Sequence, residues 1–293
     1  MKNEFLPIFV VNRSKNLENL KKIEHEDFGV LATFQESNNF LSNLRKLDKT
    51  YFIDSGFFYL SKEYSAYSEL KEIPWYLQVE CFLENNFFKR CLTLANENKI
   101  RGFIQNFLNR CDQFAPDYVL APDIINEPLL SLYLAKLALE EYNRTQRSYQ
   151  LIGVAQVGYS LYHHSTYEEN YQSLSYMETK HFLSGLISEH RNLGYKYLAL
   201  GGLLKSDSSN PTGLKFGLSN SELDQLLSWS RPNFVLGGLS LSRLPILKKH
   251  QIWADSSGWI WWDKRYDLSR FKEGRDPMKE VFAPVSETYS AII

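Results

Sequence analysis

The strongest constraint on the fold is a short run of β-branched and other apolar residues that recurs eight times along the chain. Continuous apolar runs, without polar alternation, are typical of strands that are buried on both faces of a parallel sheet. The first run, Phe5–Val11, is also too short for a signal sequence, and we interpret it as a buried strand. The eight runs cover residues 5–11, 28–34, 51–56, 118–123, 150–156, 197–203, 234–239 and 251–256.

Most gaps between these runs carry Leu, Ile or Ala at the spacing of an amphipathic helix. The expected helices are 16–24, 38–47, 127–142, 177–193, 219–229 and 241–250. The segment at Ser219 opens with Asn220, Ser221 and Glu222, which is suitable chemistry for a helix N-cap. Eight strands alternating with helices in fewer than 300 residues predict a (β/α)8 TIM barrel. A doubly wound open sheet is the alternative, although no G-x-G-x-x-G follows the first run.

The length of 293 residues and the 44% hydrophobic content suit one large domain or two modest ones. No interdomain linker is evident, so we expect a single barrel domain over residues 1–293. The third and fourth runs are about sixty residues apart, which predicts an insertion at about 57–117. We expect it to hold an enlarged loop on the catalytic face and a helix around Phe82–Ile104.

Charge and cysteine content exclude several classes of protein. With 33 basic and 34 acidic residues, the chain is neither a disordered tail nor a histone-like binder, though a local basic groove is compatible with these totals. Cys81, Cys91 and Cys111 are odd in number and widely spaced, so no disulfide framework is implied. No apolar stretch reaches the roughly 18–20 residues of a membrane span. We therefore expect a cytoplasmic protein that does not contact a membrane.

Polar or glycine residues stand at the ends of five of the predicted strands. They are Asp54, Asp123, Gln156, the pair Gly201 and Gly202, and Asp255. In a barrel these positions all lie at the C-terminal face and converge on one pocket. A single aspartate at a strand end is as often a helix N-cap, but the set together indicates a pocket with at least two catalytic residues.

This set of side chains suits displacement at a sugar carbon. One carboxylate can attack C1′ as a nucleophile while a second moves a proton. A third aspartate and a glutamine can hydrogen-bond along the edge of a planar heterocycle. Backbone N–H groups beside Gly201 and Gly202 are suited to hold a ring carbonyl.

The ordered motifs Asp54-Ser55-Gly56, Ala121-Pro122-Asp123, Gly153-Val154-Ala155-Gln156, Leu200-Gly201-Gly202-Leu203 and Asp255 resemble those of the tRNA-guanine transglycosylase superfamily. Members of this family are (β/α)8 barrels that exchange a guanine in nucleic acid for a 7-deazaguanine. The resemblance implies that Asp255 is the nucleophile and Asp54 the general acid/base. It further implies substrate-binding roles, which fall on Asp123, Gln156, Gly201, Gly202, Ser55 and Phe58, with Phe57 an equal candidate for Phe58.

Departures from the family pattern indicate a branch within it. The tRNA enzymes carry a zinc site of three cysteines and a histidine after the nucleophile strand, whereas no cysteine follows Cys111 here. The D-S-S-G-W form at 255–259 and the lack of zinc ligands are closer to the branch that inserts 7-cyano-7-deazaguanine into DNA. The implied partners are DNA and a 7-deazaguanine base, and a further protein that opens the duplex is compatible with them. No zinc, ATP or redox cofactor is expected.

Three alternatives stay open at the level of sequence. The same residues suit a tRNA-guanine transglycosylase acting on RNA. A glycoside hydrolase on the same barrel also uses two carboxylates, although one is typically a glutamate. A docking subunit without activity is the third, but such a subunit has no reason to keep both Asp54 and Asp255.

Overall fold

The computed structural model describes residues 4–12, 17–18, 20–21, 23, 27–56, 94–123, 128–156, 176–203, 219–256 and 281–283. Within these residues, eight parallel strands form a closed barrel in the order in which they occur in the sequence. The ring closes between the first and the last strand, where Ile8 lies opposite Asp255. The predicted (β/α)8 barrel is therefore confirmed.

The strands match the predicted runs, although several end earlier. They are β1 (Pro7–Val10), β2 (Gly29–Thr33), β3 (Thr50–Asp54), β4 (Tyr118–Leu120), β5 (Gln150–Gln156), β6 (Tyr197–Gly201), β7 (Phe234–Val235) and β8 (Trp253–Ser256). The prediction is best for β5, whose bounds are the same in sequence and structure. It is worst for β4 and β7, which end at Leu120 and Val235, although the backbone N–H groups of Ala121 and Leu236 still donate to carbonyls of the neighbouring strands.

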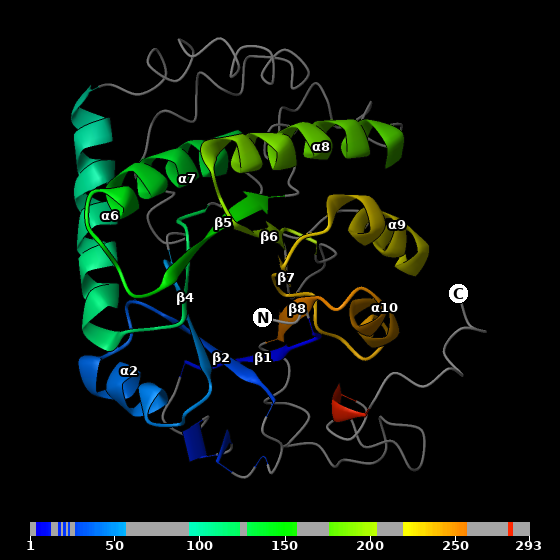
Figure 1. Cartoon of the computed structure of the whole chain (residues 1–293), viewed down its shortest axis with the longest axis horizontal. Coiled ribbons are helices and arrows are strands. Elements are labelled where there is room, and N and C mark those ends of the chain that lie inside the picture. The colour runs from blue at the N-terminus through cyan, green and yellow to red at the C-terminus, as the bar shows by residue number, and fades with distance from the viewer. Residues whose placement is uncertain are drawn as a thin grey trace, which may run out of the picture.

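Helices surround the barrel, and each described helix packs on the next one along the chain (Figure 1). They are α2 (Asn38–Arg45), α6 (Leu94–Phe114), α7 (Pro128–Asn143), α8 (Tyr176–Leu193), α9 (Asn220–Ser230) and α10 (Leu244–Lys249). The expected helix around Phe82–Ile104 is found in part, since α6 covers its residues 94–104 and continues to Phe114. Residues 57–93 of the expected insertion lie outside the described part of the structure.

Helix α9 begins as its sequence predicts. The Ser219 hydroxyl accepts a hydrogen bond from the backbone N–H of Glu222, and the Glu222 carboxylate accepts one from the backbone N–H of Ser219. This reciprocal capping box satisfies two of the N–H groups that a helix N-terminus leaves without partners. By contrast, α10 starts three residues later than expected, because residues 240–243 form a turn that precedes it.

The barrel interior determines where the polar strand ends point. Phe52, Tyr118 and Trp253 form a packed aromatic cluster, in which the Phe52 and Tyr118 rings stack with centroids 5.0 Å apart. Side chains alternate along a strand, so Asp54 and Asp255, two residues beyond Phe52 and Trp253, also face inward. The inner residues of the barrel are completed by Ile8, Leu31, Leu120, Ile152, Val154, Ala199 and Phe234.

Two loops at the N-terminal end of the barrel repeat one construction. Asp117 and Asn233 each precede a strand, and each pairs with the backbone of another strand. Asp117 accepts from the N–H of Tyr51 at 2.8 Å and donates its own N–H to the Tyr51 carbonyl. Asn233 makes the same pair of contacts with Leu198. An Ala-Pro or Arg-Pro pair stands before them, giving the sequences 115–118 (A-P-D-Y) and 231–234 (R-P-N-F).

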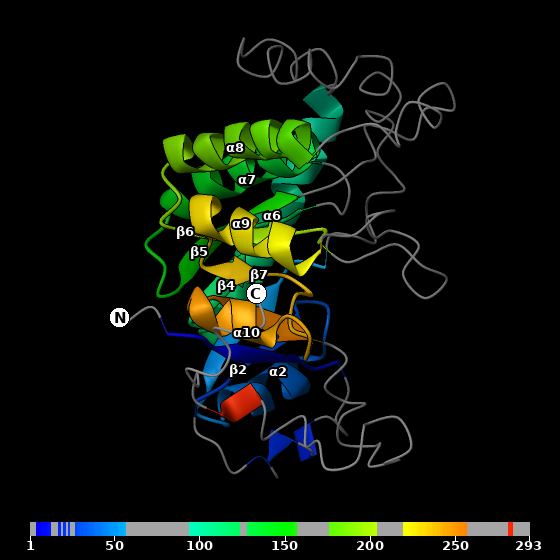
Figure 2. The ribbon, with the colours of Figure 1, turned by 90° about the vertical axis from the view of Figure 1, so that its right-hand side faces the viewer.

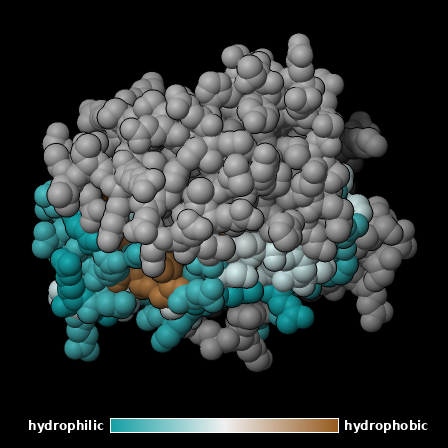
Figure 3. All heavy atoms as spheres, turned by 90° about the horizontal axis from the view of Figure 1, so that it is seen from above, coloured by the Kyte–Doolittle hydropathy of each residue, from teal (hydrophilic) through white to brown (hydrophobic). Residues whose placement is uncertain are grey.

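Figure 2 shows the same ring from the side, with α8 and α7 on one flank and α2 on the other. On the face drawn in Figure 3, most described residues are hydrophilic, and a smaller hydrophobic group lies among them. Among the described helices, none has both the length and the apolar character that crossing a membrane requires.

Candidate active site

Three aspartates meet at the C-terminal mouth of the barrel, as the sequence predicts. Asp54 ends β3, Asp255 lies in β8, and Asp123 follows β4 by three residues. Asp255 is almost fully buried, at 6% exposure, while Asp54 and Asp123 are half-buried. The Asp54 carboxylate acts electrostatically on both of the others and raises their pKa values. The ionisation of Asp123 and of Asp255 therefore depends on the charge of Asp54.

Asp255 is held by the turn that follows β7. The backbone N–H of Gly237 donates to its Oδ1 at 2.6 Å, and the N–H of Leu239 donates to its main-chain carbonyl at 3.0 Å. Burial raises the pKa of the Asp255 carboxyl to about 7, a rise that the Gly237 N–H limits and that nearby Asp54 increases. One oxygen is therefore fixed by the backbone in a group that ionises near neutral pH.

Asp54 is held by the two residues that follow it. Burial raises the pKa of its carboxyl, while hydrogen bonds from the N–H groups of Gly56 and Ser55 and from the Ser55 hydroxyl act in the opposite direction. Ser55, predicted to bind substrate, is completely buried, and its hydroxyl is engaged with Asp54. A raised pKa suits a carboxyl that must give up and recover a proton.

The loop that supports Asp54 is fixed by Gln35, a residue that the sequence analysis missed. Gln35 Nε2 donates to the Gly56 carbonyl at 3.0 Å. Gly56 has φ of 55°, and a Cβ at this position would lie 2.2 Å from Gln35 Oε1, so only glycine fits. Because the Gly56 N–H contacts the Asp54 carboxylate, Gln35 holds the turn that orients Asp54.

Asp123 and Gln156 form one hydrogen-bonded unit. Gln156 Nε2 donates to Asp123 Oδ2, while Gln156 Oε1 is buried without a partner among the described residues. Burial and the charge of Asp54 raise the pKa of Asp123 to about 8, and the Gln156 amide lowers it in part. At neutral pH Asp123 is therefore mainly a neutral carboxyl, which can donate as well as accept. Together they offer mixed donors and acceptors to the edge of a heterocycle.

Gly201 provides the space that Gln156 occupies. The two residues lie opposite each other in the pairing of β5 with β6, and Gly202 follows at the end of the strand. A Cβ at Gly201 would lie 2.4 Å from Gln156 Nε2 and 2.8 Å from its Cδ. Any larger residue at 201 would therefore push the Gln156 amide away from its present position.

This contact predicts the effect of replacing Gly201 with alanine. The new methyl group displaces the Gln156 amide and breaks its hydrogen bond to Asp123, so we expect the pKa of Asp123 to rise further. Carbon-13 NMR titration of the aspartate carboxyl groups measures the shift. Gly102→Ala is the matched control, because nothing lies within 4 Å of a Cβ there. An Asp123 pKa that is equal in Gly201→Ala and in the wild type would contradict the assigned role of Gly201.

The structure therefore brings together most of the residues predicted for the site: Asp54, Ser55, Asp123, Gln156, Gly201, Gly202 and Asp255. Phe58 lies outside the described residues, as does its alternative Phe57. The residues missed are Gln35 and Gly237, and both had a signal. Gln35 is a polar residue close to a strand end, as Gln156 is, and Gly237 opens a glycine pair close to the end of β7, as Gly201 does at the end of β6.

Within the described ranges, no group of three or more His, Cys, Asp or Glu side chains is arranged to hold a metal ion. A pocket of about 440 Å³ opens elsewhere, at the N-terminal ends of β7 and β8. It lies at the opposite end of the barrel from the three aspartates, so we assign the chemistry to the carboxylates at the mouth. Reactive groups, and not the size of a hollow, are what a displacement reaction requires.

Comparison with known proteins identifies no family for this chain. No protein-family model matches the sequence, and no curated protein matches it at a significant level. Among solved structures, the chain is similar to a crystal structure named "putative phosphonomutase" from Burkholderia cenocepacia J2315. The two are 9% identical, the match covers 91% of this chain and 92% of the other, and the TM-score is 0.49. At this level of similarity the match assigns neither a family nor an activity to this chain.

Proposed function

We propose that the protein is a pentosyltransferase that replaces guanine in DNA with a 7-deazaguanine, such as 7-cyano-7-deazaguanine, through a covalent aspartyl-sugar intermediate. The observation that carries this proposal is the convergence of Asp54, Asp123 and Asp255 on one barrel mouth, with Asp54 coupled to both of the others. The order of the motifs that contain these residues supports it, as does the Asp123–Gln156 pair, which suits the edge of a purine.

In the first step, the ionised Asp255 carboxylate attacks C1′ of the target nucleotide while the bond from C1′ to the guanine N9 breaks. The guanine leaves with the bonding electron pair and receives a proton from the neutral Asp54 carboxyl. A base inside a duplex is out of reach of this mouth, so the nucleotide must first leave the stack. The Gly237 N–H keeps one Asp255 oxygen fixed and leaves the other for the new ester bond.

In the second step, the incoming 7-deazaguanine takes the place of guanine against Asp123 and Gln156. Asp54, now a carboxylate, removes the N9 proton, and N9 attacks C1′ as the ester to Asp255 breaks. Protons and charges balance over the two steps, because Asp54 gives one proton and recovers one. The configuration at C1′ is retained, since each step inverts it once.

The experiment incubates the purified protein with 7-cyano-7-deazaguanine and either DNA or tRNA, followed by nuclease digestion and mass spectrometry of the nucleosides. The expected product is a deazaguanine deoxynucleoside from the DNA sample. A ribonucleoside from the tRNA sample would overturn the choice of DNA and keep the chemistry. Hydrolysis of an aryl glycoside without either nucleic acid, and no exchange, would favour a glycoside hydrolase.

A further inference from the structure

A second site is built at the opposite end of the barrel, in the 440 Å³ pocket between the C-terminal ends of α9 and α10. The described residues that line it are Leu227, Ser228, Arg231, Pro232, Asn233, Lys249, His250, Gln251, Ile252 and Trp253. None of these residues is acidic, and three of them carry cationic or imidazole groups. The volume is within the range of small-molecule sites, roughly 300–1,000 Å³.

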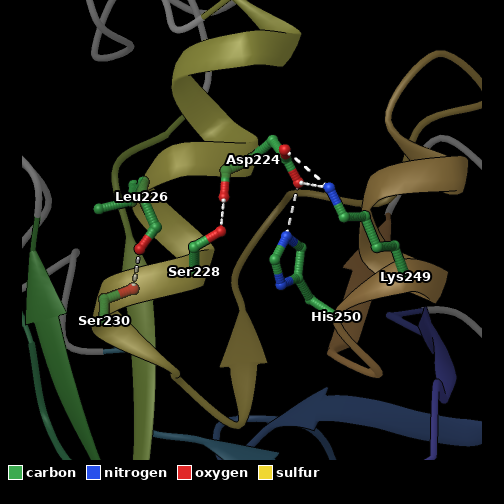
Figure 4. Close-up of polar contacts among 6 residues, drawn as sticks. All are labelled: Asp224, Leu226, Ser228, Ser230, Lys249 and His250. Atoms are coloured by element: carbon green, nitrogen blue, oxygen red, sulfur yellow. Dashed lines mark hydrogen bonds and ion pairs between the residues drawn. The ribbon is translucent and has the colours of Figure 1, made fainter. Parts of the chain in front are cut away.

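Asp224 on α9 fixes two of these groups in position (Figure 4). Lys249 Nζ lies 2.9 and 3.0 Å from the two Asp224 carboxylate oxygens, and His250 Nε2 lies 2.6 Å from Oδ1. Burial raises the pKa of Asp224, but the hydrogen bonds from Lys249 and His250 outweigh it and lower the pKa overall. Because an ionised carboxylate only accepts, Nε2 carries a proton, and Nδ1 on the other side of the ring is left for a ligand.

Arg231 is the second cationic group beside Lys249, and its backbone conformation indicates that the side chain has a function. Arg231 follows the end of α9 with φ of 45°, in the left-handed region where glycine is the usual residue. An arginine there is held against its backbone preference, at a cost of about 1 kcal/mol. Its side chain is exposed, and its guanidinium has no partner among the described residues.

The equivalent loop before β4 shows what this position needs for folding alone. Ala115 follows the end of α6 with φ of 42°, and Pro116 and Asp117 repeat the Pro232 and Asn233 construction. Helix α6 is the longer helix, yet its last turn contains no basic residue. The left-handed turn therefore does not require an arginine, and neither does the negative end of the helix dipole. We interpret the charge of Arg231 as part of the pocket.

We propose that this pocket binds the phosphate group of a small phosphorylated molecule, through the Arg231 guanidinium and the Lys249 ammonium as donors, with His250 Nδ1 accepting a hydrogen bond from a phosphate hydroxyl. Two cationic donors and one acceptor around one hollow match the oxygens and the hydroxyl of a phosphate, and Arg is suited to bind two oxygens at once. The apolar lining residues Pro232, Ile252 and Trp253 lie beside these donors and suit the organic part of such a molecule. The site is independent of the chemistry proposed at the other end of the barrel.

The test titrates the full-length protein with inorganic phosphate and with adenosine 5′-monophosphate, at constant ionic strength with chloride as the balancing anion. Nitrogen-15 NMR of the His250 ring reports on the site, and no nucleic acid is needed. We expect saturable shifts at His250 with phosphate. Tighter binding of the nucleotide would identify a phosphorylated organic ligand, and equal binding would identify free phosphate; both results support the site.

Arg231→Gly provides the decisive variant. It relieves the backbone strain, so thermal stability is maintained or increased, yet the dissociation constant for phosphate rises by about tenfold or more. Ala115→Gly is the matched control, with the same backbone relief and unchanged phosphate binding. Arg231→Gln, which keeps a polar side chain without the charge, repeats the test. His250 signals that do not respond to phosphate, or equal affinity in Arg231→Gly and the wild type, would overturn the proposal.

Discussion

Replacement of Asp255 by alanine is expected to abolish base exchange, with a loss of about 10⁴-fold or more in rate, which is typical when a nucleophile is removed. Asp255 is the most buried of the three carboxylates, and one of its oxygens is already held by the Gly237 N–H. No other side chain in the described mouth has this combination of burial and backbone support. The variant should also fail to form the covalent adduct with the sugar.

The measurement combines the exchange assay with trapping of the adduct on DNA, followed by denaturing electrophoresis. Asp27→Asn is a suitable control, since Asp27 is an exposed aspartate just before β2, at the other end of the barrel. Asp54→Asn tests the second role, and we expect it to slow both steps because the departing guanine lacks a proton donor. Wild-type exchange rates in Asp255→Ala would rule out the proposed nucleophile.

The second large effect concerns the dependence of stability on pH. The pKa values of Asp255 and Asp123 are raised by burial to about 7 and about 8, so the folded chain keeps protons that the unfolded chain has already released. The stabilisation by these protons is greatest near and below the unfolded-state pKa of about 4, declines as the pH rises, and is lost once the pH has passed 7 and 8. Between pH 6.5 and 8, we expect the free energy of unfolding to fall by about 1–2 kcal/mol.

The pH range is chosen to separate these carboxyl groups from others. Burial lowers the pKa of His190 to about 4, so this residue adds stability as the pH rises toward 6.5 and then has no further effect. The pKa of the Cys111 thiol is raised by burial, which reduces stability only at more alkaline pH. Urea denaturation of the wild type, Asp255→Asn and Asp123→Asn isolates the effect. The same slope in all three proteins would show that these carboxyl groups do not carry it.

Asp255→Asn should also be more stable than the wild type at pH 8, although it lacks activity. Ionising Asp255 places a charge in a buried position close to Asp54, and the amide removes that charge with little change of shape. If the substitution stops the reaction and also increases stability, Asp255 is a functional residue that is retained although it destabilises the fold.

Much of the barrel could be predicted because its strands are buried on both faces. Continuous apolar runs identified all eight strands of the described barrel, and β5 was predicted without error. The same signal failed for β7, which pairs over only Phe234 and Val235 although apolar residues continue to Leu239. Hydrophobicity reports burial and not hydrogen bonding between strands, so the ends of strands cannot be read from it.

The candidate site was predictable where a strand delivers a side chain directly to the mouth, as at Asp54, Gln156 and Asp255. It was not predictable where a residue acts through another one. Gln35 contacts the backbone carbonyl of Gly56, and this contact depends on how the loop after β2 is positioned against the loop after β3. The pKa values of Asp123 and Asp255 likewise depend on distances between strands that lie far apart in the sequence.

Closure of the barrel has a consequence for when the protein becomes competent during its synthesis. Asp255 lies in β8, which pairs with β1 at Ile8 and with β7, so its position is set only when the two ends of the sheet meet. The ribosome delivers β1 first and β8 about 240 residues later in the sequence. A nascent chain that has already assembled β1 to β7 therefore holds Asp54 and Asp123 but lacks its third carboxylate. Under the proposed function, a barrel that has not closed would lack its nucleophile, so we expect activity to appear only after the ring has closed.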